Sequence, residues 1–240
     1  MRKKFFLLLT AFLLTTAFTF SQTIEVLKTS GAKDLPAAQD FAFIEKKTDS
    51  AGYKFISTYK LTGTKKKANI TYLFLQVAER AKTDGANCFK LNSFHRNDSL
   101  KEATLILDTY NWNDSMRNVN FSNHEQNCIY LLGGEDPNDD NDISFKIDNE
   151  KKVLKSGTYY KHVRTNGKEV KISKGGLAGT TLWYTLVGNK PDLFLTMTGL
   201  GLGGGPVPTN VVGLSFNTGR IQPVQGDLGC LLIAILKQGE

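Results

Sequence analysis

The chain has 240 residues, and its 30 lysines and arginines against 23 aspartates and glutamates give a formal net charge of +7. Three of the basic residues stand at the N-terminus, so the remainder has 27 basic against 23 acidic residues, a net charge of +4. Its lysines are scattered apart from Lys65–Lys67. Nucleic-acid binding needs a concentrated basic stripe, whereas a scattered excess is typical of a solvated surface. We therefore expect no nucleic-acid partner.

The first residues are typical of a secretory signal peptide. A basic end at residues 2–4 precedes the apolar run Phe5–Phe20, which is shorter than the roughly 20 residues of a membrane-spanning helix. A retained membrane anchor is the alternative that this length disfavours. We expect cleavage after Ser21, with Ala17 as a second position. Residues 1–21 would then be removed, and the mature chain would be exported to the periplasm or outer surface of a Gram-negative bacterium, with no transmembrane helix.

The mature chain divides at residues 133–142, GGEDPNDDND, which hold five carboxylates and no apolar residue. We expect an acidic, flexible linker there, between a first domain at 22–132 and a second at 143–240. Asp136, Asn138, Asp140 and Asp142 alternate as the first oxygen ligands of a calcium loop do, but the rest of the stretch fits such a loop poorly. Asn141 stands where such a loop has glycine, and Ile147 stands where it has glutamate.

The first domain contains one convincing helix, predicted over Lys66–Asp84. Its apolar residues recur at helical spacing and form one stripe, and Gly85 stands where a left-handed cap would end the helix. Strand-like runs surround it at residues 41–46, 53–59, 88–94, 103–110 and 127–132. These elements predict an α+β domain in which one helix covers an antiparallel or mixed sheet.

The second domain has six or seven strand-like runs separated by turn signals such as Asn166-Gly167 and Gly188-Asn189. This pattern predicts an all-β domain, an antiparallel sandwich or a small barrel. The tail Leu228–Leu236 is continuously apolar. It is too short to span a bilayer and is expected to be an edge-closing strand or a short buried helix.

The glycine-rich stretch at residues 198–210 contains the letters of a dinucleotide-binding loop, Gly199-x-Gly201-x-x-Gly204. Such a loop needs a following helix whose amides receive the pyrophosphate. Pro206 and Pro208 follow instead, and then another strand-like run. We interpret the stretch as a bend between strands, which predicts no cofactor.

Other motifs also fail to identify a reaction. Ser215 lies in a strand pattern without the closing glycine of a nucleophile elbow, and His124-Glu125 is not followed by the second histidine of a zinc protease. His95, His124 and His162 are spread singly among polar residues and are expected at the surface. The sequence therefore predicts no catalytic, cofactor-binding or metal-binding residue.

Cys88, Cys128 and Cys230 are the cysteines, and an odd number leaves at least one thiol unpaired. An exported protein can form disulfides, and a Cys88–Cys128 bridge would contribute roughly 3–4 kcal/mol in the chain-entropy model. The alternative is that all three are small buried hydrophobic residues. The absence of a CxxC motif argues against a redox centre or a zinc ribbon.

Two aromatic pairs, Tyr159-Tyr160 and Trp183-Tyr184, are candidate ligand contacts. Adjacent residues in a strand face opposite ways, so we expect one of each pair in the core and the other exposed. An exposed aromatic ring can stack on a sugar or anchor a partner protein.

The stretch Ala78–Leu91, AERAKTDGANCFKL, resembles a helix-to-strand element of the sensor-type outer-membrane lipoproteins of the envelope-stress pathway and their relatives. In that element a helix ends in A-x-x-x-G-A-N and a strand follows. Gly85, Ala86 and Asn87 match the end of this motif, and Cys88–Leu91 would be the strand. The resemblance implies a compact α+β domain with an envelope role and no catalysis. The chain departs from these lipoproteins in lacking the lipid-anchoring cysteine.

These observations favour an exported, non-catalytic binding or structural module whose partner is an envelope protein or a polysaccharide. A secreted hydrolase of unfamiliar type is one alternative and would need a base–nucleophile pair or converging carboxylates in a cleft. A disulfide-linked envelope sensor is another, and it would need Cys88 and Cys128 at bonding distance.

Overall fold

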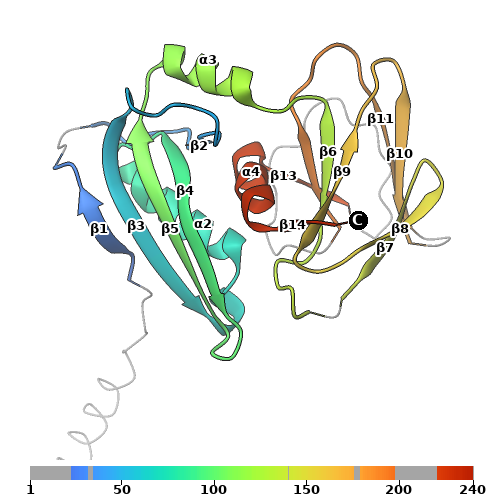
Figure 1. The fold of residues 1–240 in the computed structure, drawn as a ribbon, viewed down its shortest axis with the longest axis horizontal. Helices are drawn as coiled ribbons and strands as arrows, with labels where there is room; N and C mark the ends of the chain where they lie inside the picture. Colours follow the sequence, from blue (N-terminus) through green and yellow to red (C-terminus); the bar gives the residue numbers. More distant parts are fainter. Residues whose placement is uncertain (1–22, 32–34, 140, 176–178, 198–220, 240) are drawn as a thin grey trace, which may run out of the picture.

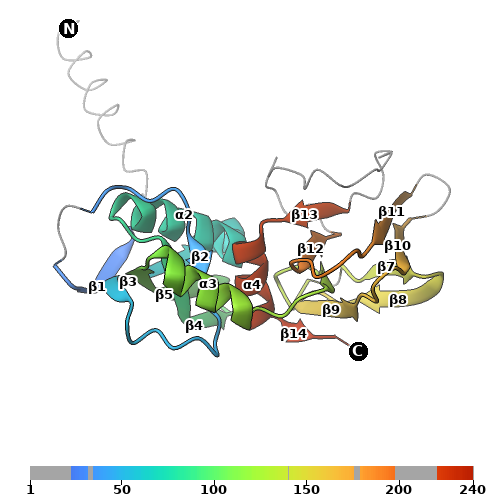
Figure 2. The ribbon, with the colours of Figure 1, turned by 90° about the horizontal axis from the view of Figure 1, so that it is seen from above.

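A computed structural model of the chain describes residues 23–31, 35–139, 141–175, 179–197 and 221–239. The expected signal peptide, the glycine-rich stretch and Ser215 lie outside these residues. Within them the chain is a mixed helix-and-sheet protein with three α-helices and three open sheets. Figures 1 and 2 show the sheets in succession, with a helix near the C-terminus between the first and the second.

The N-terminal sheet has the order β1-β3-β5-β4-β2. The strands β3, β4 and β5 are long and antiparallel, whereas β2 pairs with β4 in parallel. The sheet is therefore mixed, which is one of the two arrangements, antiparallel or mixed, that the sequence predicts. The bounds are β1 Glu25–Thr29, β2 Ala42–Phe43, β3 Lys54–Thr64, β4 Cys88–Asn97 and β5 Glu102–Asn111.

The other two sheets pack face to face. The central sheet has the order β13-β12-β6-β9-β14, and the outer sheet has the order β11-β10-β7-β8. The central strands are β6 Cys128–Leu132, β9 Thr158–Val163, β12 Leu193–Thr196, β13 Gln222–Val224 and β14 Lys237–Gln238. The outer strands are β7 Ile143–Ile147, β8 Glu150–Leu154, β10 Glu169–Lys174 and β11 Thr180–Thr185. Of the two expected β architectures, these open sheets agree with a sandwich and not with a barrel.

Helix α2, Ile70–Thr83, follows a short 3₁₀ turn at Lys65–Lys67 and agrees with the predicted stripe. Its apolar face is buried against the N-terminal sheet in one core cluster. Asn69 caps its start by accepting a hydrogen bond from the Tyr72 amide at 2.7 Å. Gly85 follows with φ +86°, and a Cβ there would lie 2.4 Å from Leu35, so this position requires glycine.

Strand β6, which ends the expected first domain, pairs with β9 and β12 in the central sheet. All five of its residues are buried. Cys128, Tyr130 and Leu132 face the cluster that contains α2, whereas Ile129 and Leu131 face the outer sheet. The run is continuously apolar because both faces of the strand are covered.

Of two further helices, the first was not expected, whereas the second is one of the two forms expected of the apolar tail. Helix α3, Asp114–Asn123, has Asn120 as its one buried residue and lies across the top of the molecule in Figure 1. Helix α4, Gly226–Ile235, is the apolar tail, here a short buried helix. It contacts β2, β4 and α2 as well as β12, so the C-terminal part is not all-β and one core cluster runs through both parts.

The expected flexible linker is docked at its first half. Glu135 is buried, and its carboxylate accepts hydrogen bonds from the Thr71 amide, at 3.0 Å, and from the Thr71 hydroxyl. Arg96 donates to the Glu135 carbonyl at 3.1 Å and forms an ion pair with Asp136. A carboxylate at a helix N-terminus satisfies unpaired amides there, which explains why an acidic residue is buried in this segment.

Candidate functional site

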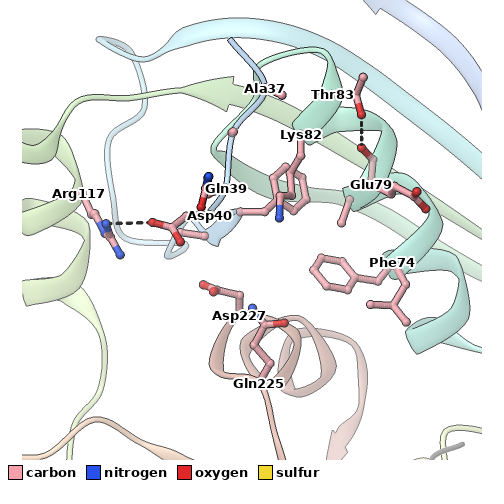
Figure 3. Close-up of a pocket in the computed structure, with 15 residues that line it drawn as sticks. Ala37, Gln39, Asp40, Phe74, Glu79, Lys82, Thr83, Arg117, Gln225 and Asp227 are labelled. Carbon is pink, nitrogen blue, oxygen red and sulfur yellow. Dashed lines mark hydrogen bonds and ion pairs between the residues drawn. The ribbon is translucent and has the colours of Figure 1, made fainter. Parts of the chain in front are cut away.

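A pocket with a volume of about 470 Å³ lies where the N-terminal sheet, α2 and the start of α4 meet. We call it the junction pocket. In Figure 3, Phe74 and Lys82 enter from α2, and Asp227 of α4 enters from the opposite side with Gln225, which directly precedes α4. Its polar lining residues are Gln39, Asp40, Glu79, Lys82, Thr83, Arg117, Gln225 and Asp227.

Residues 37–42 form one wall of the junction pocket and are fixed by backbone pairing. The amide of Ala38 donates to the Lys82 carbonyl at the end of α2, and that of Ala42 donates to Asn87, each at 2.9 Å. The Phe41 ring stacks on Phe89 of β4 with centroids 4.6 Å apart. This wall is therefore built into the fold.

The start of α4 forms the opposite wall. The Asp227 carboxylate accepts a hydrogen bond from the Phe43 amide at 2.8 Å, which fastens α4 to β2. Burial raises the pKa of Asp227, and the charge of Asp40 raises it further, while the Phe43 amide, His124 and Arg117 oppose both effects. Across the pocket mouth, Arg117 of α3 pairs with Asp40 at 3.3 Å.

A second pocket, of about 230 Å³, adjoins the first, and both are lined by Ala42, Arg117 and Asp227. We call it the His124 pocket. Trp112, Asn120, Asp192 and Phe194 line it together with His124 and Cys230. The two pockets thus share Asp227 in the first turn of α4.

His124, at the C-terminal end of α3, is the centre of a titratable cluster. Its Nδ1 lies 2.8 Å from Glu45 Oε1 and 3.9 Å from Cys230 Sγ. Burial by itself lowers the pKa of His124, but the hydrogen bond to Glu45 and the charges of Glu45, Asp227 and Asp192 outweigh it and raise the pKa. The imidazole is therefore held partly buried among carboxylates.

This cluster lacks the geometry of an activated cysteine nucleophile. Activation requires a base nitrogen that accepts from the thiol while a third group orients the other ring nitrogen. Here the same nitrogen, Nδ1, faces both Glu45 and Cys230. Burial raises the pKa of the Cys230 thiol, which keeps it protonated.

Asp192 and Glu125 extend the polar lining toward the central sheet. Asp192 accepts a hydrogen bond from the Cys128 amide at 2.8 Å, and burial raises the pKa of this carboxyl to about 6. Hydrogen bonds from Lys161 and Tyr130 lower the pKa of Glu125 despite its partial burial. The two carboxyls therefore differ in protonation under mildly acidic conditions.

The four candidate aromatic residues separate in the structure. Trp183 is 46% exposed and lies opposite Lys171 on the outer sheet. Tyr184 packs on the core between the two sheets, so this pair behaves as expected, and burial raises the pKa of Tyr184 to about 12. The Tyr159-Tyr160 pair differs from the expectation, because each ring packs partly against a different core cluster. The reason is that β9 is covered on both faces.

The cysteines agree with the second interpretation, that of small buried hydrophobic residues. Cys88, Cys128 and Cys230 are all buried free thiols. Cys88 packs with Ile44 and Trp112, whereas Cys128 belongs to the cluster that contains α2 and α4, so the bridge considered above is absent.

Sequence reasoning missed the Glu45–His124–Cys230 cluster and placed His124 at the surface. Cys230 and His124 are 106 positions apart, so no motif connects them. Only the docking of α4 against β2 and the end of α3 brings the three side chains together. The signal that could have indicated it is the polar sequence of α3, whose asparagines hydrogen-bond to the segment around Glu45.

No protein-family model, curated protein or solved structure matches this chain. The fold and the site therefore define it as a protein of mixed helices and open sheets with a polar pocket at their junction. In the part of the chain that the structure describes, no helix has the length and apolarity needed to cross a membrane.

Proposed function

We propose that this chain is an exported cell-envelope protein that binds a neutral saccharide segment of an envelope polysaccharide, without catalysis, in the junction pocket. The observation that carries the proposal is the composition of this pocket. Its volume of about 470 Å³ is within the range of roughly 300–1,000 Å³ that is usual for ligand sites.

The charges in the junction pocket favour an uncharged ligand. Lys82 and Arg117 are balanced by Asp40, Glu79 and Asp227, so no charge of one sign dominates. Carboxylates, amides and ammonium groups that face one another across a pocket can bind hydroxyls as donors and acceptors. Phe74 and Phe41 supply apolar surface beside these groups, as the two faces of a sugar ring require.

The hydrolase alternative has a specific argument against it. Two of the three carboxylates that line the pocket are engaged, since Asp227 binds the Phe43 amide and Asp40 pairs with Arg117. The one cysteine–histidine contact uses the nitrogen that also faces Glu45. We therefore infer binding rather than turnover at this site.

The test is binding of oligosaccharides, neutral and anionic, that mild hydrolysis releases from bacterial envelope polysaccharide. In the double variant Asp40→Ala/Arg117→Ala, calorimetry should record about tenfold weaker binding of a neutral oligosaccharide, because two hydrogen-bonding groups of about 0.5–1.5 kcal/mol each are lost. The matched control is Glu25→Ala/Lys60→Ala, which removes an exposed ion pair far from the pocket. It should bind as the unmodified protein does.

A second candidate site is the outward face of the outer sheet, favoured by exposed Trp183 beside Lys171. Binding that survives the double variant at Asp40 and Arg117 but is lost in Trp183→Ala would assign the saccharide to this face. That result, or the absence of binding to every oligosaccharide, would overturn the junction-pocket proposal.

A further inference from the structure

We propose that Glu45, His124 and Cys230 form a zinc site in the wall of the His124 pocket. Their ligand atoms, one carboxylate oxygen, Nδ1 and Sγ, all lie within 4.8 Å of one another. The inference does not depend on saccharide binding, because the junction pocket contains none of these three residues.

The distances are close to those of a coordinated ion. Zinc bonds of about 2.0–2.1 Å to nitrogen and 2.3 Å to sulfur, at tetrahedral angles, place the two ligand atoms roughly 3.5 Å apart. Cys230 Sγ and His124 Nδ1 are 3.9 Å apart. Glu45 Oε1 is at hydrogen-bond distance from Nδ1, 2.8 Å, and would separate from it by roughly half an ångström. The required movements are those of side chains.

The backbone around Glu45 is held in place by α3. The Asn120 side chain accepts from the Glu45 amide at 2.8 Å and donates to the Phe43 carbonyl at 2.9 Å. Asn123 donates to the Thr48 hydroxyl at 2.9 Å. Since His124 directly follows these asparagines, Glu45 and His124 are positioned by the same helix end.

Cys230 is positioned independently, by α4. The bond between Asp227 and the Phe43 amide fixes the start of this helix against β2, two residues before Glu45. Cys230 is 7% exposed, and Glu45 and His124 side chains are 23% and 22% exposed. Three elements thus converge on one point from fixed positions, as a metal site requires.

The donor set indicates the metal. Thiolate, imidazole and carboxylate are the three protein ligands of zinc, and a hard cation such as Ca²⁺ or Mg²⁺ would take oxygen ligands alone. On binding, the thiol proton and the proton shared by His124 and Glu45 pass to solvent. Because the site borders a pocket of about 230 Å³, a water molecule can complete the tetrahedron.

The test uses protein produced from the full coding sequence, purified under reducing conditions, freed of metal by a chelator and titrated with Zn²⁺ and with Co²⁺. We expect one Zn²⁺ per chain by elemental analysis, and a thiolate-to-cobalt absorption band with Co²⁺. Loss of an outer contact alone weakens zinc sites about 10–100-fold. His124→Gln, Glu45→Gln and Cys230→Ser should therefore each weaken Zn²⁺ binding by about 100-fold or more.

The matched control is Cys88→Ala, which removes another buried free thiol in a separate core cluster. It should bind Zn²⁺ unchanged and keep the cobalt band. If Cys230→Ser fails to fold, as judged by circular dichroism without metal, the Glu45 and His124 variants decide. Folded protein that takes up no Zn²⁺, or variants that bind it as tightly as the unmodified chain, would overturn the proposal.

Discussion

Gly229 lets α4 lie directly on the central sheet, and replacing it with alanine tests how closely the two are packed. A Cβ at this position would lie 2.2 Å from Cγ of Phe194 and 2.5–2.6 Å from its two Cδ atoms. Carbon atoms in contact are normally about 3.5–4.0 Å apart, so the helix or the ring must move by more than about 1 Å. The Phe194 ring is 3% exposed and stacks on Tyr130 at 5.1 Å, which leaves it no room to retreat.

The expected magnitude follows from two opposing effects. Overpacking a core costs about 1–3 kcal/mol, and the severity of this clash places it at the upper end of that range. Replacing a helical glycine by alanine gains about 1 kcal/mol. We expect Gly229→Ala to lower the free energy of unfolding by about 2 kcal/mol, measured by urea denaturation followed by circular dichroism.

Gly226→Ala is the matched control, because it lies in the same helix and a Cβ there meets no atom within 4 Å. It should leave stability unchanged or raise it by up to about 1 kcal/mol. Phe194→Leu combined with Gly229→Ala should recover part of the loss in a double-mutant cycle. Equal stability of Gly229→Ala and the unmodified protein would refute the close packing of α4 on the sheet.

Three further predictions concern the linker, the pH dependence and the outer sheet. Glu135→Ala should lower the free energy of unfolding by about 1–3 kcal/mol, because the Thr71 amide and hydroxyl lose their acceptor. Replacing exposed Asp142 by alanine should change the free energy of unfolding by less than about 0.5 kcal/mol. An equal effect of the two substitutions would contradict the docking of this segment. Because the pKa of Asp192 is raised from 3.8 to about 6, its carboxyl contributes most to stability below about pH 4 and the contribution falls as pH rises through 6. Asp192→Asn should remove this fall and raise the free energy of unfolding by about 1 kcal/mol at pH 7. This figure is smaller than the full pKa shift would give, because the group is only half-buried and solvent screens it. Identical pH–stability curves for the variant and the unmodified protein would show the reasoning to be wrong. Trp183→Ala should leave the free energy of unfolding within about 0.5 kcal/mol of the original, and a larger loss would mean that Trp183 is part of the core.

Local signals predicted much of the N-terminal sheet and its helix. The apolar residues of α2 recur at the spacing of a helix and not at that of a strand. Gly85 marks the end of the helix because the backbone there is left-handed. The pairing of β10 with β11 follows equally from alternation, since buried Val170 and Ile172 alternate with exposed or half-buried polar residues. Such elements are set by neighbours in the chain, which a sequence displays directly.

What the sequence did not indicate depends on contacts between distant segments. Helix α3 has no apolar stripe, because it is positioned by the hydrogen bonds of Asn120 and Asn123 rather than by a buried face. The acidic composition around Glu135 favoured a solvated linker, and only the open N-terminus of α2 explains why one of these carboxylates is buried. The pockets beside α4 exist because a C-terminal helix returns to the N-terminal sheet.

The proposed function rests on the claim that a ligand binds at the junction beside α4. Amide hydrogen–deuterium exchange of the protein, with and without a neutral envelope oligosaccharide, tests this claim. We predict slower exchange at residues 37–42, at the last turn of α2 and at the start of α4, with no change in the outer sheet. Protection confined to β10 and β11, or no protection at the junction with the ligand bound, would contradict the claim.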